Sequence, residues 1–212
     1  MKVGHVAVIS LLLLVLAVCV INIAEASENR LEGMVTDQNG APTAGVKVNI
    51  WDGKTLRQAV SDREGKFYVS GIAPGTFFAV RLTKSNFETV RMGGLRFPEN
   101  GNLSLTAEFV QILAGSDHIV KLPSNPSTGY SWTAIVKGRE DILSFNEKIM
   151  EEQDEKSEAG GHTKGRPGNE IWKFNALAAG RSDILLAYRR SWEGSVAPVR
   201  YHICSVTVRQ RG

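Results

Sequence analysis

The chain has 212 residues, a hydrophobic content of 42%, a charged content of 22% and a formal net charge of +3. These values are typical of a globular protein with a buried core, and the length allows one large or two modest domains. The small net charge, without a polybasic run, argues against a nucleic-acid partner.

Residues 1–26 have the pattern of a signal peptide. Lys2 precedes an apolar run over residues 6–21, and Ala-Glu-Ala at 24–26 places small residues at the two positions that a signal peptidase recognises. We therefore expect cleavage after Ala26 and export to the periplasm or outside the cell, without stable membrane insertion. The alternative is an uncleaved anchor, because the apolar run approaches the short end of a membrane span.

Cleavage at this point would leave one cysteine in the mature chain, because Cys19 lies within the signal and Cys204 is the other of two. No intrachain disulfide is then possible, so the exported fold must be held together by its core. Cys204 lies in RYHICSVTV, an alternating strand pattern, which favours a buried small residue over a nucleophile.

Short β-rich runs alternate with turn clusters from residue 31 onward, at the spacing typical of β-sandwiches, and almost nothing has helical periodicity. The first predicted strands are residues 31–36, 46–51, 55–60, 66–70, 76–82 and 87–91. Gly and Asp-Gly signals between them supply positive φ at low steric cost. Asp62 and Glu64 lack the spacing of a calcium loop, so we interpret them as turn residues.

A second set of predicted strands begins near Glu108. Its members are residues 108–113, 118–123, 130–136, 142–149, 169–177, 183–192 and 201–208. No Pro/Gly/Ser linker separates the two sets, so we expect the domains to abut. The expected fold class is all-β, with two immunoglobulin-like β-sandwich domains in tandem, residues 28–107 and 108–212, after the signal peptide. We expect a monomer.

The first domain resembles the carboxypeptidase regulatory-like (transthyretin-like) Ig-type β domain. The matching features are Gly33, the turn from Asp37 to Gly40, Pro42, Gly45-Val46, Ser61-Asp62, Gly65-Lys66-Phe67 and Pro74-Gly75. The resemblance implies a fold and says little about function, since such modules are accessory in many exported proteins.

Catalytic signatures are missing from the mature sequence. His118 and His202 lie in strand patterns, His162 lies in a charged loop, and H-E-x-x-H, C-x-x-C, G-x-S-x-G and phosphate-binding glycine motifs do not occur. A Ser/His/Asp triad leaves no signature in sequence order, but no serine lies in a recognisable nucleophile turn. We therefore expect no enzyme and no cofactor.

Three loops of the second domain draw attention instead. They are NPSTGY at 125–130, a long charged Gly-rich segment at 151–169 that ends in GRPGN, and YRRSWEGSVAP at 188–198. In an immunoglobulin-like sandwich, the connections between alternate strand pairs gather at one end, so we expect these loops to lie together. Taken singly, the first two motifs are more often a turn and a flexible loop, and Trp192 is equally well interpreted as a core residue at a loop edge.

Their combination is similar to the chagasin-type inhibitors of papain-like cysteine proteases, over about residues 108–212. NPSTGY matches the family's N-P-T-T-G-Y/F loop with one Thr-to-Ser change. The second loop keeps glycines before a W-x-F strand, Trp172 to Phe174, but has Pro167 where glycine is expected. The third loop, R-P-W/F in the family, has Ser191 in place of the proline.

The resemblance implies a papain-like cysteine protease as partner and a site on the three loops. In that scheme residues 126–129 fill the protease cleft, Asn125 braces them, and Arg190 and Trp192 contact the cleft wall. The predicted protease-binding residues are Asn125, Pro126, Ser127, Thr128, Gly129, Tyr130, Gly165, Arg166, Pro167, Gly168, Arg190, Ser191 and Trp192. The alternative function is a cell-envelope adhesion or carbohydrate-binding module.

Overall fold

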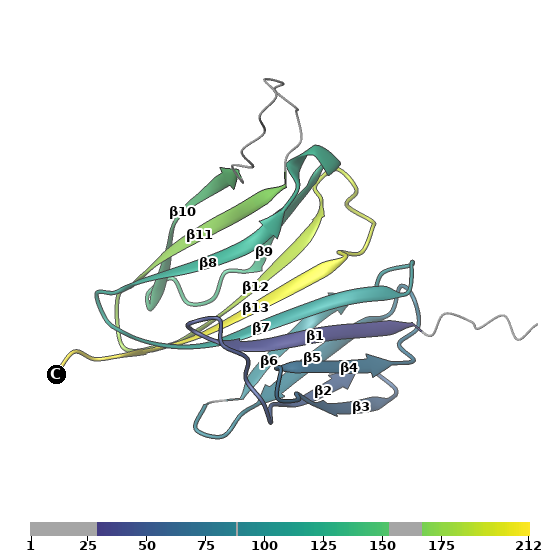
Figure 1. Cartoon of the computed structure of the whole chain (residues 1–212), viewed down its shortest axis with the longest axis horizontal. Coiled ribbons are helices and arrows are strands. Elements are labelled where there is room, and N and C mark those ends of the chain that lie inside the picture. The colour runs from purple at the N-terminus through teal and green to yellow at the C-terminus, as the bar shows by residue number, and fades with distance from the viewer. Residues whose placement is uncertain (1–28, 88, 153–166) are drawn as a thin grey trace, which may run out of the picture.

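The computed structural model describes residues 29–87, 89–152 and 167–212, so the predicted signal peptide lies outside the described residues. The described part of the chain consists of strands, their connections and one short 3-10 turn, which confirms the all-β prediction (Figure 1). In these ranges no helix is long and apolar enough to cross a membrane. The strands before the second set are β1 (Arg30–Asp37), β2 (Lys47–Trp51), β3 (Leu56–Val60), β4 (Lys66–Ser70), β5 (Phe77–Thr83) and β6 (Val90–Arg96).

The remaining strands form the second domain and its border with the first. They are β7 (Asn102–Leu113), β8 (Asp117–Ser124), β9 (Tyr130–Val136), β10 (Leu143–Glu152), β11 (Gly168–Ala176), β12 (Gly180–Arg190) and β13 (Arg200–Arg209). The central sheet has six strands in the order β4-β1-β7-β13-β12-β9. A four-stranded sheet, β3-β2-β5-β6, belongs to the first domain, and a three-stranded sheet, β10-β11-β8, belongs to the second (Figure 1).

The central sheet serves both domains because its strands alternate side chains between two cores. On β13, Tyr201 and Ile203 join the core of the first domain, whereas Cys204 and Val206 join the core of the second. Successive residues of a strand point to opposite faces, so one strand can supply both cores. The two β-sandwiches predicted from the sequence therefore share a layer.

Strand β7 carries the chain from one domain into the other without a break. The predicted set began near Glu108, but β7 starts at Asn102 and pairs in parallel with β1 on one side and β13 on the other. The expected boundary between residues 107 and 108 lies inside this strand. The strand predicted at residues 87–91 also begins later, at Val90, and extends through two glycines to Arg96.

A shared sheet predicts that the two domains unfold together. Leu105 on β7 is fully buried in the first core, and Leu105→Ala is expected to lower the free energy of unfolding by about 2–5 kcal/mol through lost contacts and a cavity. Calorimetry should show a single transition, displaced as a whole. Val60→Ala, at a side chain 59% exposed on β3, is the control and should have little effect. Two separate transitions, of which only one moves, would contradict the prediction.

Candidate functional site

The first loop joins β8 to β9 and is closed by its own hydrogen bonds. Asn125 caps the 3-10 turn Pro126–Thr128: its Oδ1 accepts from the Ser127 backbone N–H at 3.2 Å and from Ser127 Oγ at 2.6 Å. The backbone N–H of Thr128 and its Oγ1 donate to the Asn125 carbonyl at 3.1 and 2.6 Å. The predicted bracing by the Asn125 side chain is confirmed.

Gly129 reverses the chain at the end of this turn. Its φ is +78°, in the left-handed region, and its N–H donates to the Pro126 carbonyl at 3.0 Å. A Cβ at this position would lie 2.1 Å from Cη2 of Trp192, which comes from the third loop. Both the backbone conformation and the contact with the indole therefore require glycine.

Aromatic side chains support the loop from below. The Asn125 backbone N–H donates to the Tyr188 hydroxyl at 2.9 Å. The Tyr188 ring stacks on Tyr130, with centroids 5.3 Å apart, and packs against Trp132 at 5.1 Å. Tyr130 is half-buried, as expected for a residue that belongs partly to the core and partly to the loop. The exposed part of the loop is then Pro126, Ser127 and Thr128.

A buried carboxylate joins the strands beneath the loop, and sequence reasoning missed it. Glu170 on β11 is 4% exposed and accepts hydrogen bonds from Ser124 Oγ at 2.8 Å and from the Trp132 backbone N–H at 3.2 Å. Lys148 Nζ neutralises it at 2.6 Å and also donates to the Trp132 carbonyl at 2.9 Å. The sequence does contain an indication of this burial. Glu170 lies two residues before Trp172 in an alternating strand, so both side chains point to the inward side.

The second loop is described only at its end. Gly165 and Arg166 lie outside the described residues, and Pro167 is exposed. Gly168 begins β11 and pairs with Ser124, the residue before the first loop. A Cβ on Gly168 would lie 2.5 Å from the Glu151 carbonyl oxygen on β10, so this glycine allows the strands to approach closely where the loop returns.

The third loop begins at Arg190, which pairs with Tyr130 at the start of β9. Arg190 Nε donates to the Thr128 carbonyl at 3.1 Å, and the guanidinium lies 4.8 Å from the centroid of the Tyr130 ring. Its Nη1 also pairs with Glu193 at 3.0 Å. Arg190 was predicted as a contact to a protease wall; in the free protein it supports the first loop. Ser191 is exposed, and Trp192 is 68% exposed beside Gly129.

The described parts of the three loops thus lie at one end of the second domain, as the sequence predicted (Figure 1). Gly168 is opposite Ser124, Arg190 is opposite Tyr130, and Trp192 touches the first loop directly. The result is a turn held by hydrogen bonds, with an exposed tip. It is flanked by Pro167 and Gly168 at the start of β11 and by Arg190 and Trp192 of the third loop.

Comparison with family models gives two matches. Residues 111–206 match the chagasin family peptidase inhibitor I42, and residues 30–110 match the carboxypeptidase regulatory-like domain. The second domain is a chagasin-family domain. The first is a carboxypeptidase regulatory-like domain, so both resemblances expected from the sequence are confirmed. No curated protein matches the sequence significantly.

Comparison with solved structures gives several similar chains. The cysteine protease inhibitor EhICP2 from Entamoeba histolytica is 24% identical, with 50% of this chain and 97% of that chain covered and a TM-score of 0.39. PbICP-C, solved in complex with falcipain-2, is 15% identical over 51% of this chain and 92% of that chain, with a TM-score of 0.40. The CupB6 tip adhesin from Pseudomonas aeruginosa is 8% identical over 86% and 84%, with a TM-score of 0.31.

Cys204 is fully buried, which confirms the expectation for this residue. Burial raises the pKa of its thiol well above the ordinary value, and the nearby charge of Glu108 adds to the effect. A thiol that is buried and protonated is not a nucleophile. The sequence did not predict its neighbours: His118 and Glu108 place donor atoms beside the sulfur, a set that could hold a metal ion.

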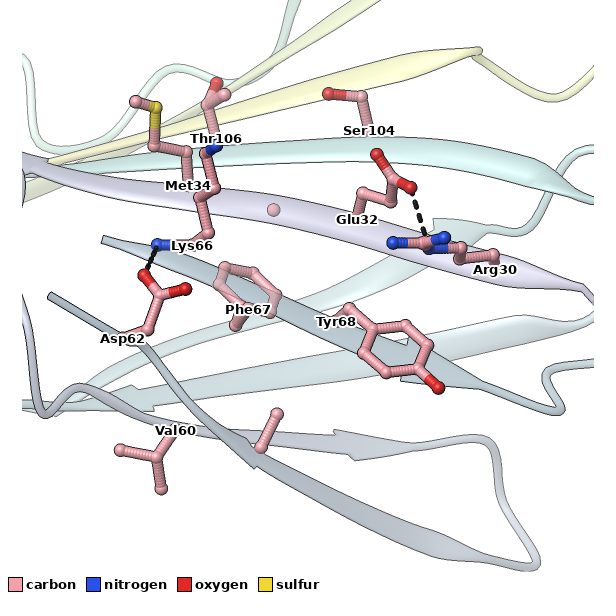
Figure 2. A pocket seen from close by; sticks show the side chains of 12 residues that line it. Arg30, Glu32, Met34, Val60, Asp62, Lys66, Phe67, Tyr68, Ser104 and Thr106 are labelled. Atoms are coloured by element: carbon pink, nitrogen blue, oxygen red, sulfur yellow. Dashed lines mark hydrogen bonds and ion pairs between the residues drawn. The ribbon is translucent and has the colours of Figure 1, made fainter. Parts of the chain in front are cut away.

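A cavity of about 650 Å³ lies on the first domain, on the part of the central sheet formed by β4, β1 and β7 (Figure 2). Tyr68 stands in it, 53% exposed, and the Arg30 guanidinium lies 4.8 Å from the centroid of its ring. Glu32 pairs with Arg30 at 2.7 Å. Of the predicted loop residues that the structure describes, none lines this cavity.

The contact between Gly129 and Trp192 gives a testable prediction. Gly129→Ala is expected to lower the free energy of unfolding by about 1–3 kcal/mol, because alanine is strained at this φ and its Cβ displaces the indole. Chemical denaturation measures the loss, and tryptophan fluorescence reports the altered surroundings of Trp192.

Gly194 is the matched control in the third loop, because a Cβ there meets no atom within 4 Å and its φ is not positive. Gly194→Ala should leave both stability and fluorescence unchanged. Equal effects of the two substitutions would show that the contact with Trp192 is not formed.

Proposed function

We propose that this protein is a reversible inhibitor of papain-family cysteine proteases that blocks the active-site cleft with the three loops of its chagasin-family domain. The observation that carries the proposal is the braced turn at residues 125–129, with Pro126, Ser127 and Thr128 exposed between two other loops. Inhibition needs binding alone, with no cofactor and no covalent chemistry on the part of this chain.

The turn is suited to enter a cleft that cleaves extended chains. A substrate presents an extended backbone, whereas Pro126–Thr128 is coiled into a 3-10 turn that ends in a left-handed glycine. The hydroxyls of Ser127 and Thr128 are bonded back to Asn125, which keeps the tip narrow. The scissile-bond geometry of a substrate is therefore not offered to the catalytic thiolate.

Preorganisation supports tight binding. The turn is held by hydrogen bonds within the loop, by Arg190 and by the Tyr188 hydroxyl, so little conformational entropy is lost when it binds. A standard interface buries about 1,600 Å² in total, which a tip with two flanks can supply. Trp192 is the natural anchor, because an exposed tryptophan beside the tip has the properties of a binding hot spot.

Export of the mature chain, as a monomer in the periplasm or outside the cell, is part of the proposal. The loops then meet proteases outside the cytoplasm, and the first domain is an accessory module. Two departures from the family's loop patterns are expected to change target preference. Pro167, in place of glycine, stiffens the second loop, and Ser191, in place of proline, removes a constraint on the position of Trp192.

A second candidate function is carbohydrate binding in cell-envelope adhesion. The observation in its favour is Tyr68, whose exposed ring stands in the cavity of the first domain (Figure 2). The Arg30 guanidinium already lies over this ring, in a position where a sugar ring would otherwise stack. Binding of glycans that is lost in Tyr68→Ala, without any inhibition of papain, would favour this function over the first.

Titration of papain with the purified protein tests the main proposal. We expect stoichiometric, reversible inhibition that is abolished when Ser127 and Thr128 are replaced by arginine and glutamate, because the widened tip no longer fits the cleft. The same pair placed at Ala178 and Ala179, exposed at the opposite end of the domain, should leave inhibition unchanged. Absence of inhibition at micromolar protein would exclude the function, and inhibition that survives the Ser127/Thr128 exchange would exclude this mechanism.

Trp192→Ala should weaken inhibition by about 30-fold or more, the loss expected of a hot spot worth about 2 kcal/mol. Its melting temperature should be unchanged, because the side chain is 68% exposed. Val196→Ala, in the same loop at a side chain 46% exposed, is the control and should inhibit like the wild type. An inhibition constant for Trp192→Ala within threefold of the wild type would remove Trp192 from the interface.

A further inference from the structure

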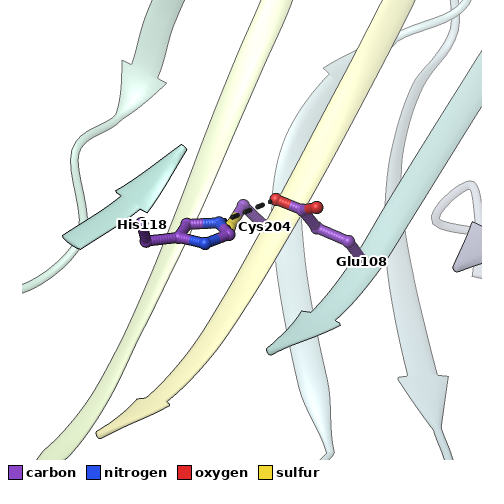
Figure 3. Close-up of side chains that lie close together, drawn as sticks. All are labelled: Glu108, His118 and Cys204. Atoms are coloured by element: carbon purple, nitrogen blue, oxygen red, sulfur yellow. Dashed lines mark hydrogen bonds and ion pairs between the residues drawn. The ribbon is translucent and has the colours of Figure 1, made fainter. Parts of the chain in front are cut away.

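A cluster of ionisable side chains lies inside the second domain, away from the three loops. His118 comes from β8 in the three-stranded sheet, whereas Glu108 on β7 and His202 and Cys204 on β13 come from the central sheet. Figure 3 shows His118 and Glu108 meeting beside Cys204. The histidines are 7% and 6% exposed and the cysteine is fully buried.

Donor atoms of Glu108, His118 and Cys204 all lie within 4.8 Å of one another. His118 Nε2 lies 3.1 Å from Glu108 Oε1 and 3.3 Å from Cys204 Sγ. Tetrahedral coordination at zinc bond lengths separates ligand atoms by about 3.3–3.8 Å. Two edges of such a tetrahedron are therefore close to the required length before any ion is bound, and His202 stands outside this group of three.

His202 shows that hydrogen bonds alone do not satisfy the cluster. Its Nδ1 lies 2.9 Å from the Thr106 hydroxyl oxygen. Its Nε2 is buried and has no hydrogen-bond partner among the described residues.

Thiol, imidazole and carboxylate together suit a borderline transition-metal ion such as Zn²⁺. Mg²⁺ and Ca²⁺ require sets made of oxygen ligands, so the donors at this position disfavour them.

An entry path to the cluster is present. A cavity of about 500 Å³ lies where the two domains meet, and Glu108, Thr106 and His202 are part of its lining. An ion that enters by this cavity reaches the Glu108 carboxylate first. Cys204 and His118 then complete the shell from within the core.

We propose that Glu108, His118 and Cys204 form a binding site for one zinc-class transition-metal ion inside the chagasin-family domain, with the fourth position left to water and His202 beside the Glu108 ligand. When the ion binds, the proton on His118 Nε2 moves to Nδ1 and the thiol proton is released to solvent, so that both atoms become ligands. The ion joins the three-stranded sheet to the central sheet, a cross-link at a cysteine that is a free thiol in the described part of the chain.

Cobalt spectroscopy on the full chain tests the site directly. A Cys19→Ser background leaves Cys204 as the single thiol, and dialysis against a chelator removes resident metal. Co²⁺ should bind one ion per chain with a thiolate-to-metal charge-transfer band, and Zn²⁺ should abolish that band. Zn²⁺ at about 100 times its dissociation constant should raise the melting temperature by about 5–10 °C, and Mg²⁺ and Ca²⁺ should not.

Cys204→Ser and His118→Gln should each weaken Zn²⁺ binding by at least about 100-fold, because each removes one of the three ligands. His162→Ala, at a histidine outside the described residues, is the control and should bind like the parent. The proposal is overturned if folded protein gives no charge-transfer band at millimolar Co²⁺, or if zinc stabilisation persists in both variants. Should a variant fail to fold, the Co²⁺ spectrum of the parent still decides, because its charge-transfer band requires the Cys204 thiolate. Papain inhibition plays no part in these readouts.

Discussion

Parallel pairing between β7 and β13 is the constraint on which the rest of the structure depends. Ten residues of β13 run in register with β7, from Arg200 opposite Ser104 to Arg209 opposite Leu113. Parallel strands are stable where both faces are covered, and here each face is covered by a different domain. Leu105 and Ile203 pack toward the first domain, while Val110 and Val206 pack toward the second. The chain thereby forms two sandwiches with three layers.

The loops inherit their positions from these buried strands. β12 lies beside β13 in the central sheet and brings Arg190 opposite Tyr130, so the third loop leaves the sheet next to the first. In the outer sheet, β11 brings Gly168 opposite Ser124. Glu170 connects the two sheets beneath the turn by accepting hydrogen bonds from Ser124 and Trp132. An exposed turn can then be rigid because its foundations are buried, which is what an inhibitor requires of the segment it presents.

Most strands and the gathering of the loops could be predicted from the sequence, because alternation and turn residues are local signals. The capping role of Asn125 is also local, since a side chain bonds to a backbone group two residues away. The start of β7 at Asn102 was missed because a strand shared by two cores does not end at a domain boundary. The contacts of Glu170 and the cluster around Glu108 depend on residues far apart in the chain, whose register only the folded sheets determine.

The shared layer makes the loop-bearing domain inseparable from its companion. Cutting the chain before β7 would expose Leu105, Leu185 and Ile203, all fully or almost fully buried in the intact protein, as a continuous apolar face on the isolated second domain. A surface of that kind drives self-association. The regulatory-like domain therefore covers an apolar face of its neighbour, and separation of the two by proteolysis would lead to aggregation even if every loop residue were intact.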